Sequence, residues 1–312
     1  MNQLRIIFMG TPEFAVSSLE ALVENKFHVI AVISAPDKPQ GRGQKMTASP
    51  VKVCAIKYGI PVLQPTNLKS PEFLNELKTF NANLQIVVAF RMLPEVVWSL
   101  PSLGTFNLHA SLLPQYRGAA PINWSIINGE KQTGTTTFFL QHEIDTGSII
   151  YQQPEPILET DDAGSLYNRL KISGARLVVQ TVEAIANGAY PSIPQAEIKD
   201  LKFAPKIFKE TCAINWNQST KNVVNFVRGL SPHPTAWTTI DGKVFKIFRV
   251  KPAGILPHDS GNLKGERWQT DNKSYLYFPS TDGWVSVEEL QPEGKRRMAI
   301  GEFFRGNKLV VS

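Results

Sequence analysis

Short apolar runs alternate with amphipathic segments over the first 186 residues. The runs have the length of buried strands and predict strands at 4–9, 28–34, 84–90, 105–108 and 148–152. The intervening segments have helical spacing and predict helices at 12–24, 50–58, 71–79 and 164–186. Thr11 is the expected N-cap of the first helix, with Pro12 at its first position. This alternation predicts a Rossmann-like α/β domain with a mostly parallel sheet.

The pattern changes after residue 186. Residues 187–206 contain three prolines and no clear periodicity, which is typical of an interdomain linker. Beyond them the sequence predicts a helix at 219–229 and a series of short alternating runs, namely AWTTI, KVFKIFRV, SYLYF, WVSVEEL and KLVVS. Turn signals such as Asp241-Gly242 and Asp282-Gly283 separate the runs. We therefore expect a domain at 1–188, a linker at 189–206 and a small β-barrel or sandwich at 207–312.

Composition agrees with two folded domains in a reducing compartment. The chain has 312 residues, of which 42% are hydrophobic and 19% charged, so a disordered chain is excluded. Cys54 and Cys212 are too few for a disulfide scaffold. The N-terminus lacks the features of a secretory signal, and no apolar run is long enough to cross a bilayer. We expect a cytoplasmic monomer with no membrane contact.

Charge is distributed unevenly along the chain. Residues 1–204 hold 17 basic and 17 acidic side chains, whereas residues 205–312 hold 16 and 10, so the net charge of +6 lies in the last third. Clustered Lys and Arg side chains neutralise phosphates, which favours a polyanionic partner such as a nucleic acid. The alternative is an ordinary solvated surface.

Several well-known motifs are missing from the sequence. The first strand leads into MGTPEF, without the G-x-G-x-x-G of a dinucleotide site. The chain also contains no P-loop, no H-E-x-x-H and no C-x-x-C sequence. The motifs therefore predict neither phosphoryl transfer by a P-loop nor a metal site.

The stretch GTFNLHASLLPQYRGAAP, residues 104–121, carries the main candidate chemistry. Side chains alternate along a strand, so Asn107 and His109 share one face while Phe106 and Leu108 share the other. The carboxyl ends of strands in open α/β sheets are where ligands bind. An exposed histidine there is suited to proton transfer near neutral pH, although it could also be a hydrogen-bonded residue at a strand end.

Two further segments are candidates for function. Asp145, in HEIDTGSII, could accept a hydrogen bond from the imidazole and stabilise its charged form, or it could simply form a turn. Residues 34–50 form a basic loop that is long for a strand-to-helix connection. Arg42 in this loop is suited to contact a phosphate, although the loop could instead be merely solvated.

Taken together, MGTPEFA, PDKPQGRG, FNLHASLLPQYRGAAPI, DTGSII and RGLSPHPTAW resemble the methionyl-tRNA formyltransferase family over nearly the whole chain. The SLLP motif is shared by the wider group of folate-dependent formyltransferases. The stretch VVAFRMLPE, residues 87–95, differs from the Tyr-Gly-containing stretch common in this family.

The resemblance implies transfer of a formyl group from 10-formyltetrahydrofolate to the methionine of initiator Met-tRNA. It assigns catalysis to Asn107, His109 and Asp145, folate contact to Ser111, Leu112, Leu113 and Pro114, and contact with the tRNA acceptor end to Arg42 and Lys45. It also implies an OB-like C-terminal barrel along the acceptor arm and no metal. Direct transfer is the expected mechanism, because neither cysteine lies in the site motif.

Two alternatives remain open from the sequence. The first is a folate-dependent formyltransferase acting on a nucleotide sugar or a small amine, for which a basic C-terminal domain would have no explanation. The second is a non-catalytic RNA-binding protein on a formyltransferase scaffold. The presence of Asn107, His109 and Asp145 argues against this second alternative.

Overall fold

The computed structural model describes residues 4–40, 44–254 and 267–310. The chain divides into two compact units. The first comprises Met1–Gly118, Thr133–Glu155 and Tyr167–Lys202, and the second comprises Ala119–Gln132, Pro156–Leu166 and Phe203–Ser312. Two internal segments thus group with the C-terminal region, an arrangement that the sequence did not predict.

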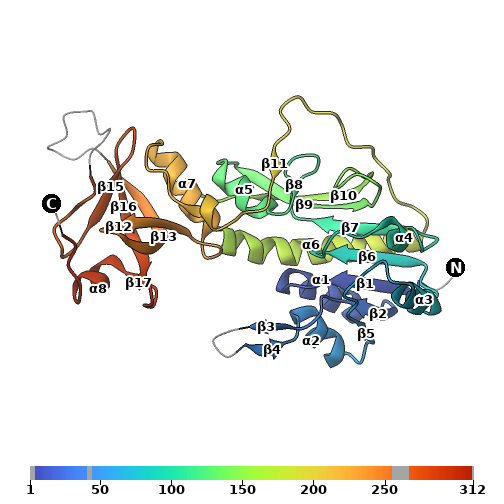
Figure 1. Cartoon of the computed structure of the whole chain (residues 1–312). Coiled ribbons are helices and arrows are strands. Elements are labelled where there is room, and N and C mark those ends of the chain that lie inside the picture. The colour runs from blue at the N-terminus through green and yellow to red at the C-terminus, as the bar shows by residue number, and fades with distance from the viewer. Residues whose placement is uncertain (1–3, 41–43, 255–266, 311–312) are drawn as a thin grey trace. The chain divides into compact units, whose positions relative to one another are not determined.

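A sheet of seven strands, counted over the described residues, forms the centre of the first unit in the order β10-β9-β7-β6-β1-β2-β5 (Figure 1). The pairs joining β5, β2, β1, β6 and β7 are parallel, whereas β9 is antiparallel to β7. Its strands are β1 (Ile6–Gly10), β2 (Val29–Ile33), β5 (Val62–Leu63), β6 (Leu84–Val88), β7 (Thr105–His109), β9 (Gln132–Phe139) and β10 (Ile149–Pro156). Strands β1 and β6 are buried along their whole length, and the one polar side chain in them, Gln85 of β6, accepts a hydrogen bond from the Thr105 hydroxyl.

Helices cover both faces of this sheet. They are α1 (Glu13–Glu24), α2 (Pro50–Lys57), α3 (Pro71–Thr79), α4 (Glu95–Trp98) and α6 (Ala163–Ala186). Phe73 of α3 and Val97 of α4 join Met9 and Val87 in one hydrophobic cluster, so these two helices share a face. On the other face, Leu108 of β7 packs against Gly174 of α6, where a Cβ atom would lie only 2.9 Å from the Leu108 side chain.

The structure confirms the predicted α/β arrangement and refines its boundaries. Helix α3 has the predicted bounds, and β7 extends one residue further, to His109. The prediction of Thr11 as the N-cap of α1 is wrong, because Pro12 occupies that position and makes no side-chain cap. The expected loop at 34–50 contains two short antiparallel strands, β3 (Lys38–Gln40) and β4 (Lys45–Thr47).

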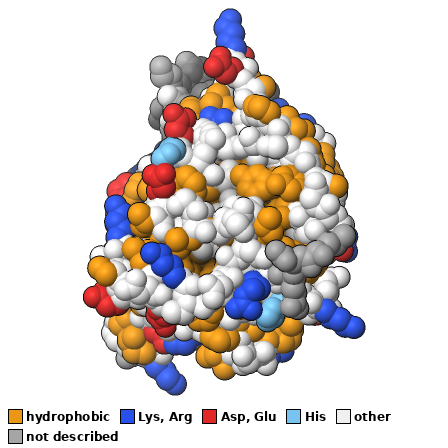
Figure 2. Space-filling model, turned by 90° about the vertical axis from the view of Figure 1, so that its right-hand side faces the viewer, with side chains coloured by type: hydrophobic (Ala, Val, Ile, Leu, Met, Phe, Trp, Pro, Cys, Tyr) orange, Lys and Arg blue, Asp and Glu red, His pale blue; other side chains and the backbone are white. Residues whose placement is uncertain are grey.

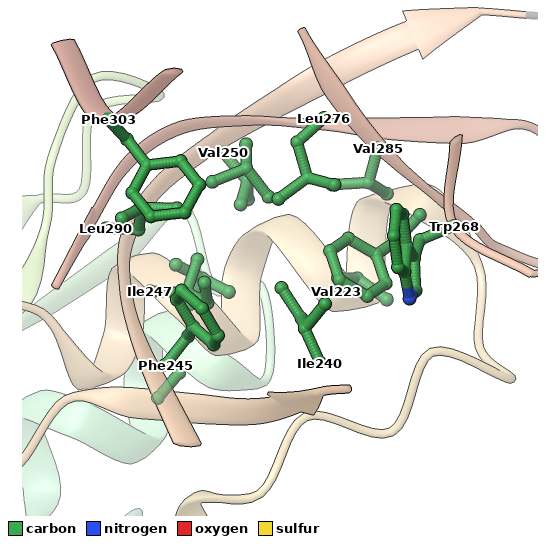
Figure 3. Packing of buried hydrophobic residues seen from close by; sticks show 14 of the residues in the cluster. Val223, Ile240, Phe245, Ile247, Val250, Trp268, Leu276, Val285, Leu290 and Phe303 are labelled. Carbon is green, nitrogen blue, oxygen red and sulfur yellow. The ribbon is translucent and has the colours of Figure 1, made fainter. Parts of the chain in front are cut away.

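The second unit has an antiparallel sheet with its own hydrophobic core. Over the described residues the sheet has the order β12-β13-β16-β15-β14, with β17 paired to β16. Figure 3 shows helix α7 packed on the sheet, with Val223 of the helix near Ile240 and Trp268. The elements are α5 (Pro121–Ile127), η1 (Glu210–Cys212), α7 (Thr220–Leu230), β12 (Ala236–Ile240), β13 (Lys243–Gly254), β14 (Gln269–Thr270), β15 (Leu276–Pro279), β16 (Trp284–Pro292), β17 (Met298–Ala299) and α8 (Ile300–Phe304). Two short strands remain among the described residues, β8 (Arg117–Gly118) of the first unit and β11 (Phe203–Ala204) of the second.

The predicted small β domain is confirmed, with one wrong element. Strand β12 coincides with AWTTI, and Ser219 caps α7 by accepting a hydrogen bond from the Asn222 N–H. The prediction of a strand at KLVVS is wrong for residues 308–310, which have no regular structure, and residues 311–312 lie outside the described part. The preceding segment IGEFF forms α8, which buries Phe303 and Phe304 against the core.

Charges are mixed on the face of the molecule drawn in Figure 2, where basic and acidic side chains lie among apolar ones. No helix within the described ranges combines the length and hydropathy that a bilayer span requires.

Candidate active site

Strand β7 presents two polar side chains on one face of the sheet. Phe106 and Leu108 are almost completely buried and point to the opposite face, which holds the strand in place. Asn107 is half-buried, and the side chain of His109 is 7% exposed. The carboxyl end of β7 therefore carries an amide and an imidazole on one face, as the alternation predicts. The expectation of an exposed histidine is wrong, because the imidazole is largely desolvated.

The imidazole of His109 is held by a backbone carbonyl. Its Nε2 lies 2.9 Å from the carbonyl oxygen of Tyr116. A carbonyl oxygen can only accept a hydrogen bond, so Nε2 carries the hydrogen and donates it. In the neutral ring Nδ1 is then the nitrogen with a free lone pair. Tyr116 is buried and has a φ of 60°, a strained conformation that directs its carbonyl toward the ring.

Asp145 lies beside the free nitrogen of His109. Its Oδ2 is 3.9 Å from Nδ1, which is within ion-pair distance but too long for a hydrogen bond. The same oxygen accepts a hydrogen bond of 3.0 Å from the Gly118 N–H. The structure therefore brings Asp145 to His109, and the tautomer of the ring is set by Tyr116 and not by Asp145.

The loop that carries Asp145 depends on a glycine. Asp145 has a φ of 55°, in the left-handed region that favours Gly and tolerates Asp. Two residues later, a Cβ atom at Gly147 would lie 1.6 Å from the carbonyl oxygen of Phe139. No other residue type can be placed there without moving the backbone of β9. The loop therefore requires glycine at position 147 for steric reasons, and not only because glycine is common in turns.

The turn at residues 111–114 is tightly bonded to its surroundings. Ser111 is fully buried, and its hydroxyl donates a 2.6 Å hydrogen bond to the Gln115 carbonyl. Leu113 is buried against Phe138 and Ile149. Leu112 and Pro114 remain half-exposed. Of the four predicted folate-contacting residues, these two have accessible side chains, whereas Ser111 and Leu113 fix the shape of the turn.

The predicted tRNA-contacting loop is an anchored hairpin. At its base, Asp37 receives hydrogen bonds from Lys52 (2.7 Å) and Gln64 (2.8 Å). These two bonds, that from Gln64 foremost, lower the pKa of Asp37 below its ordinary value. Lys45 is exposed on β4, whereas Arg42 lies outside the described residues.

Sequence reasoning missed the residues that support the catalytic triplet. Tyr116 and Gly118 hold His109 and Asp145, and Arg117 between them bonds to Gln195, 78 residues away. Residues 116–118 lie within the motif PQYRGAAP, so the sequence shows that they follow the strand of His109 but not which groups they contact. The partnership with Gln195 carried no signal, because nothing in one sequence pairs a glutamine with a distant arginine. Within the described residues, no group of three or more His, Cys, Asp or Glu side chains could hold a metal ion.

Comparison with known proteins gives matches over the whole chain. Residues 4–182 match the family described as formyl transferase, and residues 206–308 match its C-terminal domain. A methionyl-tRNA formyltransferase of Parabacteroides distasonis is 53% identical, covering 99% of this chain and 98% of that protein. One from Bacteroides fragilis is 52% identical, with coverage of 98% and 95%.

A solved structure supports the fold. The N-formyltransferase from Helicobacter canadensis, in complex with folinic acid and dTDP-3-aminofucose, has a TM-score of 0.67 to this chain. It is 22% identical, and the match covers 93% of this chain and 99% of that one. At this level of identity the likeness establishes the shared architecture.

Proposed function

This chain belongs to the methionyl-tRNA formyltransferase family, and we propose here how its residues carry out the reaction of that family. The protein transfers the formyl group of 10-formyltetrahydrofolate to the α-amino group of the methionine on Met-tRNA, giving the formylated tRNA used in translation initiation. The reaction is the attack of an amine on a carbonyl carbon. A proton must leave the amine, and negative charge develops on the formyl oxygen. The bond between the formyl carbon and the folate nitrogen then breaks, and that nitrogen takes up a proton as tetrahydrofolate leaves.

His109 takes the proton from the attacking amine. With Nε2 donating to the Tyr116 carbonyl, Nδ1 is the nitrogen available for this step. The ring becomes an imidazolium on accepting the proton. The Asp145 carboxylate, 3.9 Å away, then stabilises that positive charge in a site that is largely shielded from water.

Asn107 stabilises the formyl oxygen. Its amide NH₂ can donate a hydrogen bond, and its position on the same face of β7 as His109 supports joint action on one substrate. The half-exposed Leu112 and Pro114, on a turn stiffened by Ser111 and Leu113, provide a surface for the folate. Transfer is direct, because neither Cys54 of α2 nor Cys212 of η1 lies in the sequence segments that carry Asn107, His109 and Asp145.

The tRNA is bound by both parts of the chain. We assign residues 1–188 to catalysis, 189–206 to a linker and 207–312 to a tRNA-binding domain, which the two adjacent family matches support. The net charge of +6 in the last third suits a polyanion. We assign contact with the acceptor end to Lys45 of β4 and to Arg42, which lies outside the described residues. The enzyme acts as a cytoplasmic monomer on initiator Met-tRNA.

The observation that carries the mechanism is the convergence of Asp145 on Nδ1 of His109 from 36 positions away in the chain. The direct test is transfer of labelled formyl from 10-formyltetrahydrofolate to Met-tRNA by the purified protein. Uncharged tRNA, which lacks the amine, is the control and should remain unlabelled. Transfer to an amino sugar nucleotide in preference to Met-tRNA would contradict the proposed substrate; the relatives do not favour that alternative.

A further inference from the structure

The segment predicted as a linker packs closely on the first unit as far as Lys202. Ile193 and Ile149 exchange two backbone hydrogen bonds, of 2.8 and 2.9 Å. Near the other end of the segment, the Lys202 carbonyl accepts a 2.7 Å hydrogen bond from the Tyr116 N–H. Tyr116 is the residue whose own carbonyl holds His109. This part of the linker is therefore attached to the catalytic site.

Gln195 lies between these two attachments and contacts the loop of Asp145. Its Nε2 donates to the backbone carbonyls of Asp145 (2.8 Å) and Gly147 (2.9 Å). Its Oε1 accepts hydrogen bonds from Nε (3.2 Å) and Nη2 (2.7 Å) of Arg117. The surroundings leave one orientation for the amide, because a flipped group would place its oxygen against two carbonyls and its NH₂ against a guanidinium.

Through these four hydrogen bonds, Gln195 links Arg117 to the backbone of the Asp145 loop. Arg117 precedes Gly118, whose N–H binds the Asp145 carboxylate, while the Gln195 amide holds the backbone carbonyls of Asp145 and Gly147, on the C-terminal side of the Asp145 side chain. The side chains of residues 141–144 are exposed, so few packing contacts restrain this loop. His142 contacts Trp98 and Glu95 at the outer end of the loop, so the hydrogen bonds from Gln195 act at its inner end, beside Asp145 itself.

We propose that Gln195, oriented by Arg117, is a positioning residue that holds Asp145 beside Nδ1 of His109. This inference rests on the proposed roles of His109 and Asp145. It assigns the linker a catalytic purpose in addition to joining two domains. Loss of the two donors from Gln195 releases the Asp145 backbone, and the carboxylate no longer meets the imidazolium at a fixed distance.

The test is a double-mutant cycle in the full-length enzyme. Single-turnover formylation of Met-tRNA is measured for Gln195→Ala, Asp145→Asn and the double variant, together with KM for the folate. Gln195→Ala should lower the rate roughly ten- to a hundredfold, since misplacement by about 1 Å can cost about 10². It should have little further effect in the Asp145→Asn background, because both changes remove one interaction.

Two more variants sharpen the test. Gln195→Glu keeps an acceptor for Arg117 but loses the donors to the two carbonyls, and it should be at least as slow as Gln195→Ala. Gln153→Ala removes the same amide from an exposed position on β10 and should retain the native rate. General destabilisation by Gln195→Ala would lower the rate in both backgrounds, so the cycle separates it from positioning.

The outcomes distinguish this inference from the proposed function. A native rate for Gln195→Ala, or effects of the two variants that multiply in the double variant, would overturn the positioning role and leave the catalytic assignment intact. A native rate for Asp145→Asn would instead overturn the role of Asp145 in the proposed function, and the positioning role with it.

Discussion

The two compact units use opposite kinds of sheet, and the net positive charge lies toward the C-terminal end of the sequence. The first unit has a mostly parallel sheet with helices on both faces, so its polar chemistry is concentrated where strands end, at Asn107 and His109. The second has an antiparallel sheet, and the last 108 residues hold the whole net charge of +6. Chemistry and attraction to a polyanion are therefore encoded in different parts of the chain. Substitutions should accordingly separate into changes of rate and changes of tRNA affinity.

Removal of the imidazole should have the largest effect, and on rate alone. We expect His109→Ala to lower kcat by about 10²–10⁴, the usual contribution of a positioned general base. KM for Met-tRNA should change little, because the imidazole acts on one amine and not on the RNA backbone. Single-turnover transfer of labelled formyl measures this. The matched control is His28→Ala, an exposed histidine of the same unit, and a similar loss in that variant would show that the effect is not specific to the site.

Removal of the Asn107 amide should come next. Asn107→Ala should lower kcat by about 10²–10³, because a donor to a developing oxyanion acts mainly in the transition state. Affinity for the folate should stay near the native value. Asn75→Ala, on the exposed side of α3, removes the same group and should leave kcat unchanged. A variant at Asn107 with an unchanged kcat and a raised KM for the folate would make Asn107 a binding residue.

The sequence predicts which residues form the site better than it predicts the contacts that hold those residues in place. Alternation along a strand placed Asn107 and His109 on one face, and the structure agrees because Phe106 and Leu108 are buried on the other. The steric need for Gly147 and the hydrogen bond that His109 donates to the Tyr116 carbonyl depend on backbone positions that no sequence pattern reveals. The same holds for Gln195, which lies in a segment that reads as a linker because it has no periodicity.

Salt should weaken the binding of tRNA to the basic C-terminal region, residues 205–312. KM for Met-tRNA should rise more than tenfold between 50 and 200 mM salt if the enzyme neutralises about three phosphates, whereas KM for the folate should change far less. Titration of the full chain is preferable to deletion of the C-terminal region. Residues 119–132 and 156–166 belong to the second compact unit and would lose their packing partners in a truncated protein. A KM for Met-tRNA that does not change with salt would contradict electrostatic binding of the tRNA by the C-terminal region.

The hairpin should contribute a smaller change in affinity. Arg42→Ala and Lys45→Ala should each raise KM for Met-tRNA about three- to tenfold, the loss of one phosphate contact, and leave the folate KM unchanged. Lys69→Ala, an exposed lysine elsewhere in the first unit, is the charge-matched control. If all three variants behave alike, total charge and not the hairpin determines the effect.

The smallest expected effects concern the two buried thiols. Cys54 lies in the first unit and Cys212 in the second. Burial raises the pKa of Cys54 in α2 to about 11, and it also raises that of Cys212 in η1. Both thiols should therefore react slowly with a thiol reagent at pH 8 in the native protein and quickly once unfolded. Because the raised pKa of Cys54 favours its neutral form, its contribution to stability should persist below pH 9.0 and be lost between 9.0 and about 11.

Single-cysteine variants test whether the two units unfold independently of each other. Cys212→Ser leaves the thiol of the first unit, and Cys54→Ser leaves that of the second. Modification rates followed across a urea series should show different midpoints if each unit opens by itself, as two separate cores predict. One shared midpoint would mean that the units unfold as a single cooperative body. Fast modification in native buffer would contradict the burial of that thiol.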